Sequence, residues 1–264
     1  MDQCVNTTGA FMKSISYNLK DKSFVITGGS RGIGFTIAKM LLDEGASVLI
    51  CGRKQDNLEK AAEALNGGDS LAVHTAHIAK EEDVDSLFDK AVSLFGTLDG
   101  FVHNAAMNIP TTLVDSDAGI WNKIMDTNLN GAYLCLRKAG RVMKNNGRGK
   151  IVSISSIASR RAAPFMGIYG IAKAGIEMMT RVVAQELAPY NIQVNAVAPA
   201  MVRTDFSRPF WSDENIHAHI VKTIPMGRIA EQSDVAHPVL FLLSEGADYI
   251  TGTTIAVDGG SLAV

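Results

Sequence analysis

The sequence is poor in cysteine, in long apolar runs and in net charge, and each shortage excludes a class of protein. Its 264 residues include three cysteines with no CxxC spacing, which argues against a disulfide framework or a cysteine-rich metal site. No apolar stretch reaches the ~20 residues that a membrane helix needs. A net charge of −2 gives no electrostatic reason to expect nucleic acid or an anionic membrane as partner.

Metal-binding and targeting motifs are also scarce. The six histidines form no HExxH motif, and His217 and His219 are two residues apart, which places them on different faces of a helix. We therefore expect no metal. Residues 1–18 lack the apolar core and cleavage site of a signal peptide. We interpret them as an N-terminal extension and expect a cytoplasmic protein.

Apolar residues are plentiful, at 47% of the chain, which is enough for a large core. Short apolar runs alternate with segments of helical periodicity, and this alternation predicts a parallel sheet of right-handed βαβ units. Nearly continuous apolar strands predict helices on both faces. We therefore predict one α/β domain with a doubly wound, seven-stranded parallel sheet. The expected strands are residues 23–27, 47–51, 71–75, 100–103, 150–154, 192–197 and 254–257.

A glycine-rich turn follows the first expected strand. Gly28, Gly32 and Gly34 would let the backbone turn sharply and approach a pyrophosphate at the start of the next helix. Their spacing differs from GxGxxG, but their position at the first strand–helix junction favours a dinucleotide site over a purely structural turn.

The end of the second expected strand indicates which dinucleotide binds. Residues 51–54 contain no acid of the kind that holds the ribose 2′-hydroxyl in NAD enzymes. Arg31 and Arg53 are suited to a 2′-phosphate instead, so we predict NADP(H) rather than NAD(H). The alternative is that Arg53 and Lys54 only solvate the start of a helix.

Candidate catalytic residues occupy three segments. Tyr169 and Lys173 are four apart in a helical stretch, which places the phenol and the ammonium on one face. Such pairs are common by chance. Ser156, however, follows the expected strand 150–154, at the edge of the sheet where these folds bind ligands. Asn128 lies in the helical run 121–143.

These motifs, in this order, resemble those of the short-chain dehydrogenase/reductase family, of the short single-domain type with a Rossmann-type fold. The resemblance covers about residues 18 to 260 and implies hydride transfer between a nicotinamide cofactor and a carbonyl or secondary alcohol. It is carried by Thr27 to Gly34, Asn104-Ala105-Ala106, Asn128, Ser156, Tyr169-x-x-x-Lys173, Ala198-Pro199 and the stretch from Tyr249 to Gly260.

The resemblance also implies a role for each residue. Tyr169 would be the general acid or base, and Ser156 would polarise the carbonyl. Lys173, together with the charge of the oxidised nicotinamide, would lower the pKa of Tyr169, and it would also hold the cofactor ribose. Asn128 would hold a water that relays protons to Lys173. The implied cofactor contacts are Gly28, Ser30, Arg31, Ile33, Gly34, Arg53, Ile78, Asn104, Ala105, Tyr169, Lys173, Pro199, Val202 and Thr204.

The chain departs from the family pattern at the end of its third strand. His77-Ile78 stands where an Asp usually meets the adenine, and Ala106 stands where a Gly is usual. The C-terminal third is similar to 3-oxoacyl carrier-protein reductases. Those enzymes commonly carry an Arg for the acidic carrier just before the sixth strand, where this chain has Tyr190-Asn191.

The aromatic, apolar interval 204–228 contains no expected strand and is interpreted as a substrate lid, similar to that of carbonyl and retinal reductases. We therefore predict a carbonyl reductase for a free, fairly apolar ketone. A 3-oxoacyl-thioester reductase and a non-catalytic regulatory member remain alternatives. An epimerase is disfavoured by the glycine spacing. Arg160 and Arg161, at the expected pocket rim, either attract an acidic substrate or are only solvated. The resemblance also implies a homo-oligomer, a tetramer or a dimer.

Overall fold

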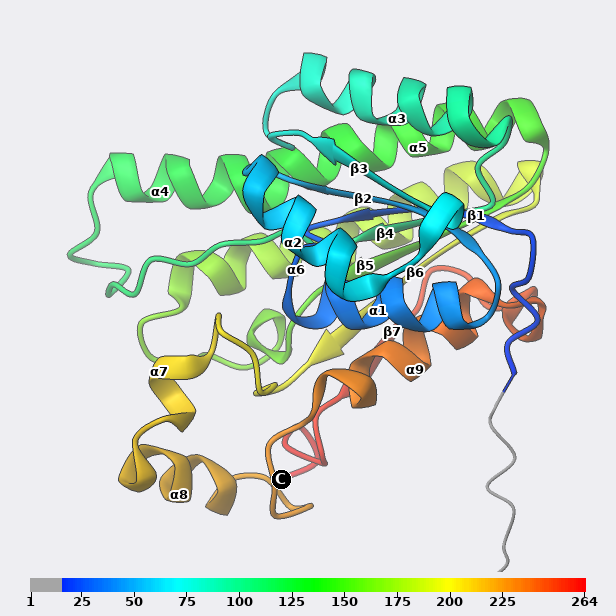
Figure 1. The fold of residues 1–264 in the computed structure, drawn as a ribbon. Helices are drawn as coiled ribbons and strands as arrows, with labels where there is room; N and C mark the ends of the chain where they lie inside the picture. Colours follow the sequence, from blue (N-terminus) through cyan, green and yellow to red (C-terminus); the bar gives the residue numbers. More distant parts are fainter. Residues whose placement is uncertain (1–15) are drawn as a thin grey trace, which may run out of the picture.

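In the computed structural model, which describes residues 16–264, a parallel sheet lies between two layers of helices (Figure 1). The predicted fold is confirmed: all six neighbouring strand pairs are parallel, in the order β3-β2-β1-β4-β5-β6-β7. Residues 1–15, most of the expected N-terminal extension, and Cys4 lie outside the described residues. The strands are β1 Ser23–Thr27, β2 Ser47–Gly52, β3 Leu71–Thr75, β4 Gly100–His103, β5 Gly149–Ile154, β6 Ile192–Pro199 and β7 Thr254–Val257.

Alternate residues of each strand contribute to two separate cores. Ile26 and Ile50 pack with helices α1, α2 and α9 on one face of the sheet, and Val25 and Leu49 pack with α3, α5 and α6 on the other. The main helices are α1 Gly32–Asp43, α2 Gln55–Leu65, α3 Glu81–Phe95, α4 Ala118–Met125, α5 Gly131–Asn146, α6 Gly167–Leu187, α7 Arg208–Trp211, α8 Glu214–Lys222 and α9 Gln232–Leu243. None of the helices in the described part is long and apolar enough to cross a membrane.

The interval 204–228 folds as two short helices rather than as an open loop. These are α7 and α8, and Figure 1 shows them beyond the carboxyl end of β6. Asp213 starts α8 by accepting hydrogen bonds from the backbone N–H groups of Asn215 and Ile216, at 2.9 and 3.0 Å. This interval therefore covers the same sheet edge to which the catalytic motifs belong.

The helices differ in whether acidic or capping side chains occupy their N-termini. Helix α3 has three acidic residues in its first turn, and α4 is capped by Asp117. Helix α1 has neither an acidic residue in its first turn nor a capping side chain at Arg31. Its N-terminal N–H groups and its positive dipole end are thus left for an external anion.

The start of α1 lies at the point where the strand order reverses, between β1 and β4, which is where such sheets bind ligands. The amide of Asn104, just after β4, donates to the carbonyl oxygens of Thr27 and Gly28, both at 3.0 Å. Gly28 has a φ of +68°, a backbone conformation that favours glycine. The turn is thus fixed between two strands.

Gly34 should be irreplaceable in this turn. An alanine Cβ there would lie 2.4 Å from the Gly28 carbonyl oxygen, within rigid backbone. Despite alanine's helix-propensity advantage of about 1 kcal/mol, we expect Gly34→Ala to lower the free energy of unfolding by about 1–3 kcal/mol through overpacking, as measured by urea denaturation. Gly246→Ala is the control, because its Cβ would meet nothing closer than 3.4 Å. Equal effects of the two substitutions would contradict this account.

Candidate active site

Two cavities meet beside Tyr169. One, of about 390 Å³, runs along the glycine turn and the carboxyl ends of β1, β2 and β4. The other, of about 320 Å³, lies between the segment after β5 and helices α7 and α8. Tyr169, Thr204 and Phe206 line both, so two ligands could lie against each other at the phenol.

The first cavity, which we call the groove, gathers most of the predicted cofactor contacts. Pro199 and Val202 line the second cavity instead, beside Thr204. Gly34 lines neither cavity and packs against the Gly28 carbonyl oxygen instead. The predicted contacts that line the groove are Gly28, Ser30, Arg31, Ile33, Arg53, Ile78, Asn104, Ala105, Tyr169, Lys173 and Thr204.

The groove is electropositive. Arg31, Arg53 and Lys54 line it with exposed side chains and form no ion pair within the described residues. One carboxylate lines the same groove, that of Asp205, and it is paired with Arg208. Three cations that repel one another and face an uncapped helix start are suited to an anionic ligand.

Lys173 is buried between α6 and the end of β5, at 1% exposure. Its ammonium donates a hydrogen bond of 2.6 Å to the Ile154 carbonyl oxygen and lies 5.5 Å from the centre of the Tyr169 ring. Burial lowers the pKa of Lys173 to about 7. Tyr169 and Lys173 are thus brought together on one face of α6, as their spacing predicts.

The pKa of Tyr169 depends on how deeply its side chain is buried. Burial raises it to about 12, and a hydrogen bond with the Ser156 hydroxyl acts in the opposite direction. The Lys173 ammonium bonds to the Ile154 carbonyl oxygen and faces the tyrosine ring. The protein alone therefore stabilises the neutral phenol.

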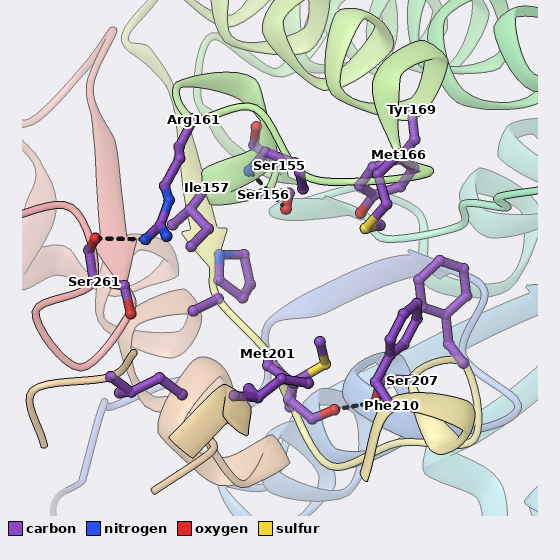
Figure 2. Close-up of a pocket in the computed structure, with 18 of the residues that line it drawn as sticks. Ser155, Ser156, Ile157, Arg161, Met166, Tyr169, Met201, Ser207, Phe210 and Ser261 are labelled. Atoms are coloured by element: carbon purple, nitrogen blue, oxygen red, sulfur yellow. Dashed lines mark hydrogen bonds between the residues drawn. The ribbon is translucent and has the colours of Figure 1, made fainter. Parts of the chain in front are cut away.

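Ser156 is fixed by the start of a short 3₁₀ helix, Ile157–Ser159. Its Oγ accepts a hydrogen bond of 3.2 Å from the Ala158 backbone N–H. Because the backbone donates to this oxygen, the hydroxyl hydrogen remains free to donate in turn. Ser156 and Tyr169 both line the second cavity (Figure 2).

Glu177 is a further buried residue of the site that the sequence reasoning missed. Its carboxylate accepts from Ser159 Oγ at 2.6 Å and pairs with Arg160 Nε at 3.1 Å, and Ser155 Oγ lies 3.2 Å away. It fixes the segment after β5 against α6. Its position four residues after Lys173, on the same helix face, could have identified it from the sequence.

Asn128 lies in a π-helical turn, Asp126–Asn130, between α4 and α5. Its amide donates to the Met107 carbonyl oxygen at 2.7 Å and accepts from the Met107 N–H at 2.8 Å. Asn128 is therefore placed to fix the chain after β4, and the water relay stays a prediction. Nearby His103 is fully buried, and burial together with the Lys173 charge lowers its pKa to about 3, so it is neutral.

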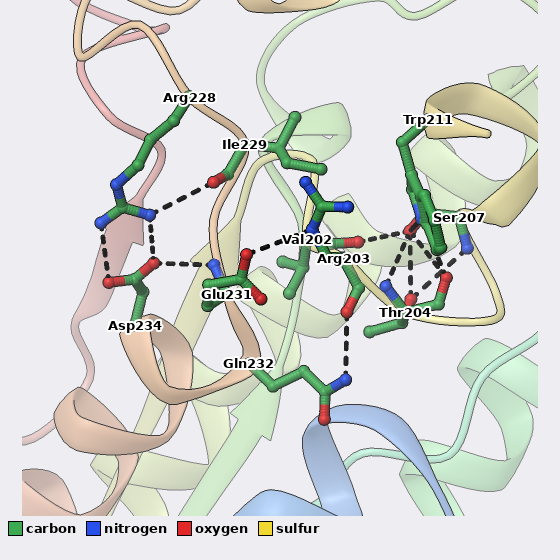
Figure 3. A network of polar contacts seen from close by, with 10 residues as sticks. All are labelled: Val202, Arg203, Thr204, Ser207, Trp211, Arg228, Ile229, Glu231, Gln232 and Asp234. Atoms are coloured by element: carbon green, nitrogen blue, oxygen red, sulfur yellow. Dashed lines mark hydrogen bonds and ion pairs between the residues drawn. The ribbon is translucent and has the colours of Figure 1, made fainter. Parts of the chain in front are cut away.

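Polar contacts join the interval 204–228 to the segment after β6 at one end and to α9 at the other (Figure 3). Ser207 hydrogen-bonds to the Val202 carbonyl, and Trp211 Nε1 donates to the Thr204 carbonyl oxygen at 3.1 Å. At the other end, Arg228 pairs with Asp234 at 2.6 Å. Between these attachments, Phe206, Phe210 and Ile220 line the second cavity.

Comparison with known proteins shows to which family the chain belongs. The family of enoyl-(acyl carrier protein) reductases matches residues 28–261. The human dehydrogenase/reductase SDR family member 4 is 37% identical over 245 residues, which cover 92% of this chain and 88% of the relative. The human mitochondrial SDR family member 2 is 37% identical over 260 residues, covering 97% and 91%.

Solved structures show the same similarity. A short-chain type dehydrogenase/reductase from Mycobacterium ulcerans has a TM-score of 0.89 at 32% identity and covers 94% of this chain and 92% of its own. A levodione reductase has a TM-score of 0.89 at 28% identity, with coverages of 93% and 99%. With its fold, its site and these relatives together, the chain belongs to the short-chain dehydrogenase/reductase family of oxidoreductases.

Proposed function

We propose that this enzyme interconverts a carbonyl compound and a secondary alcohol with NADP(H), using Tyr169 as the general acid and base. The observation that carries the proposal is the meeting of the two cavities at Tyr169, beside Ser156 and the buried Lys173. One cavity has the charge and backbone geometry for a dinucleotide, and the other is mostly apolar.

The residues of the groove fit the cofactor. The uncapped start of α1 and the glycine turn suit a pyrophosphate. Arg31 and Arg53 have no carboxylate partner among the described residues and suit an additional 2′-phosphate, which supports NADP(H) over NAD(H). When bound, the nicotinamide supplies or accepts the hydride.

Side chains of the protein would supply the proton and the hydrogen bonds to the substrate oxygen. A phenol with a pKa of about 12 is fully protonated at neutral pH, so Tyr169 is ready to give its proton to a carbonyl oxygen that gains negative charge. Ser156, whose Oγ accepts from the backbone, would donate its hydroxyl hydrogen to the same oxygen.

We further propose that residues 204–228 are the substrate lid. Its apolar side chains, Phe206, Phe210, Ile220 and Ile224, cover the second cavity. Such a lining favours a free, fairly apolar ketone over a thioester on an acidic carrier protein. One of the similar structures is a levodione reductase, which by its name is also a reductase.

The proposed enzyme is a homo-oligomer, associated through α5 and α6. Tyr133, Met178 and Val182 are exposed on these helices. They line a common shallow hollow with Met125, the last residue of α4, and Leu129 of the following turn. A contiguous apolar surface of this kind is suited to contact with another copy.

Removing the phenol hydroxyl should abolish proton transfer and leave cofactor binding in place. We expect Tyr169→Phe to lower kcat for NADPH-dependent ketone reduction by about 10²–10⁴-fold, the usual range for a general acid. The rate is measured by NADPH absorbance, and the thermal shift with NADPH serves as the control for folding and binding. A variant with near-normal kcat would exclude Tyr169 as the proton donor.

Arg53 should select the phosphorylated cofactor. We expect Arg53→Ala to weaken NADPH binding by about 10- to 100-fold, the value of charge-assisted hydrogen bonds, and to leave NADH binding nearly unchanged. Titration calorimetry with both cofactors measures this. Arg148→Ala is the matched control, because Arg148 is exposed, pairs with Asp99 and does not line the groove. Tighter NADH than NADPH binding in the wild type would refute the assignment.

The buried Lys173 should make stability depend on pH. An unfolded lysine releases its proton near pH ~10.4, whereas Lys173 in the folded chain does so near pH 7. Between these values the unfolded state binds one more proton, so stability should rise with pH by up to about 1.4 kcal/mol per unit. Urea denaturation at pH 7, 8 and 9 should show this rise in the wild type and a smaller one in Lys173→Met. Identical slopes would show that Lys173 keeps an ordinary pKa.

A further inference from the structure

One charged side chain lines the second cavity, and it belongs to Arg161. The other residues that the structure places around this cavity are apolar or uncharged. Figure 2 shows Arg161 and Ser261 on one side of Ser156, and Tyr169 and Met166 on the other. The cavity therefore has a positive charge at the end away from the catalytic phenol.

The neighbouring Arg160 is used differently. Its Nε pairs at 3.1 Å with the carboxylate of Glu177, a buried residue at 5% exposure, so the charge of the exposed Arg160 is balanced by a carboxylate of the protein. Arg160 also does not line the cavity. The sequence does not distinguish the two arginines, but the structure does. Arg160 pairs with a buried carboxylate, and Arg161 lines the cavity.

Arg161 has no carboxylate partner among the described residues. Its Nη1 donates to the Ser261 carbonyl oxygen at 3.2 Å. The acidic residue of the same C-terminal segment, Asp258, accepts instead from the N–H groups of Gly260 and Leu262, at 3.0 and 2.8 Å. A guanidinium has five N–H donors, so most of those on Arg161 remain for a ligand.

We propose that Arg161 binds a carboxylate at the far end of the substrate, while the reacting carbonyl lies between Ser156 and Tyr169. The substrate class is then an oxo-carboxylate, or the matching hydroxy-carboxylate, with an apolar chain between its two functional groups. The planar guanidinium matches a carboxylate through two parallel hydrogen bonds. This inference rests on the proposed function, because it assigns the substrate of that site.

Binding of an unreactive carboxylate tests the anchor without turnover. The probes are octanoate and octanamide, which share chain length and differ in charge, titrated calorimetrically into the protein with and without NADP⁺. We expect octanoate to bind the wild type about 10-fold or more tightly than octanamide, as for a charge-assisted hydrogen bond. Arg161→Gln should remove that preference, and Arg161→Lys should retain part of it.

Arg160→Gln is the control, since it removes the same charge one residue away and outside the cavity. It should keep the preference for octanoate, and the ratio of the two affinities does not depend on the fraction of folded protein. The proposal is overturned if the wild type does not bind octanoate, shows no preference, or keeps its preference in Arg161→Gln. Failure of NADPH-dependent ketone reduction, with the preference intact, would refute the proposed function and leave the anion site standing.

Discussion

The buried hydrogen bond from the Lys173 ammonium to the Ile154 carbonyl is the constraint around which the site is arranged. Removing an ammonium from water costs several kcal/mol, and this one has a backbone dipole rather than a carboxylate as its partner. That contact ties α6 to the end of β5, and so it sets Tyr169 opposite Ser156. The same burial moves the pKa values of lysine and phenol in opposite directions, and both shifts favour neutral forms.

In the electropositive groove, unlike at Lys173, the positive charges are exposed to water. Leaving them without a carboxylate partner therefore costs little free energy of folding. Arg31 is the residue before α1, which starts without a capping side chain, and Arg53 directly follows β2. The protein thus keeps the positive charges of the groove exposed to water and buries another, that of Lys173, beside Tyr169. An anion can lie against the first set with little reorganisation.

Much of this arrangement follows from local sequence. The apolar runs predict all seven strands, because a strand covered on both faces has almost no polar positions. Three strand boundaries differ from the prediction because backbone pairing continues beyond the apolar run, at Gly52, Gly149 and Pro199. The spacing of Tyr169 and Lys173 predicts their shared face. Contacts between distant segments could not be predicted, such as Asn128 with Met107, because they depend on how the packed elements meet.

The i, i+4 spacing of Tyr169 and Lys173 predicts a shared helix face, but it does not say to which atom the ammonium is directed. In the structure the ammonium is directed to the Ile154 carbonyl oxygen.

The position of Thr204 and Phe206 has a different consequence. These two side chains form part of the wall of both cavities. A molecule in either cavity would contact the same two residues, through which each ligand could change the affinity of the other. By thermodynamic linkage, whatever factor the first ligand applies to the affinity of the second, the second applies to the first.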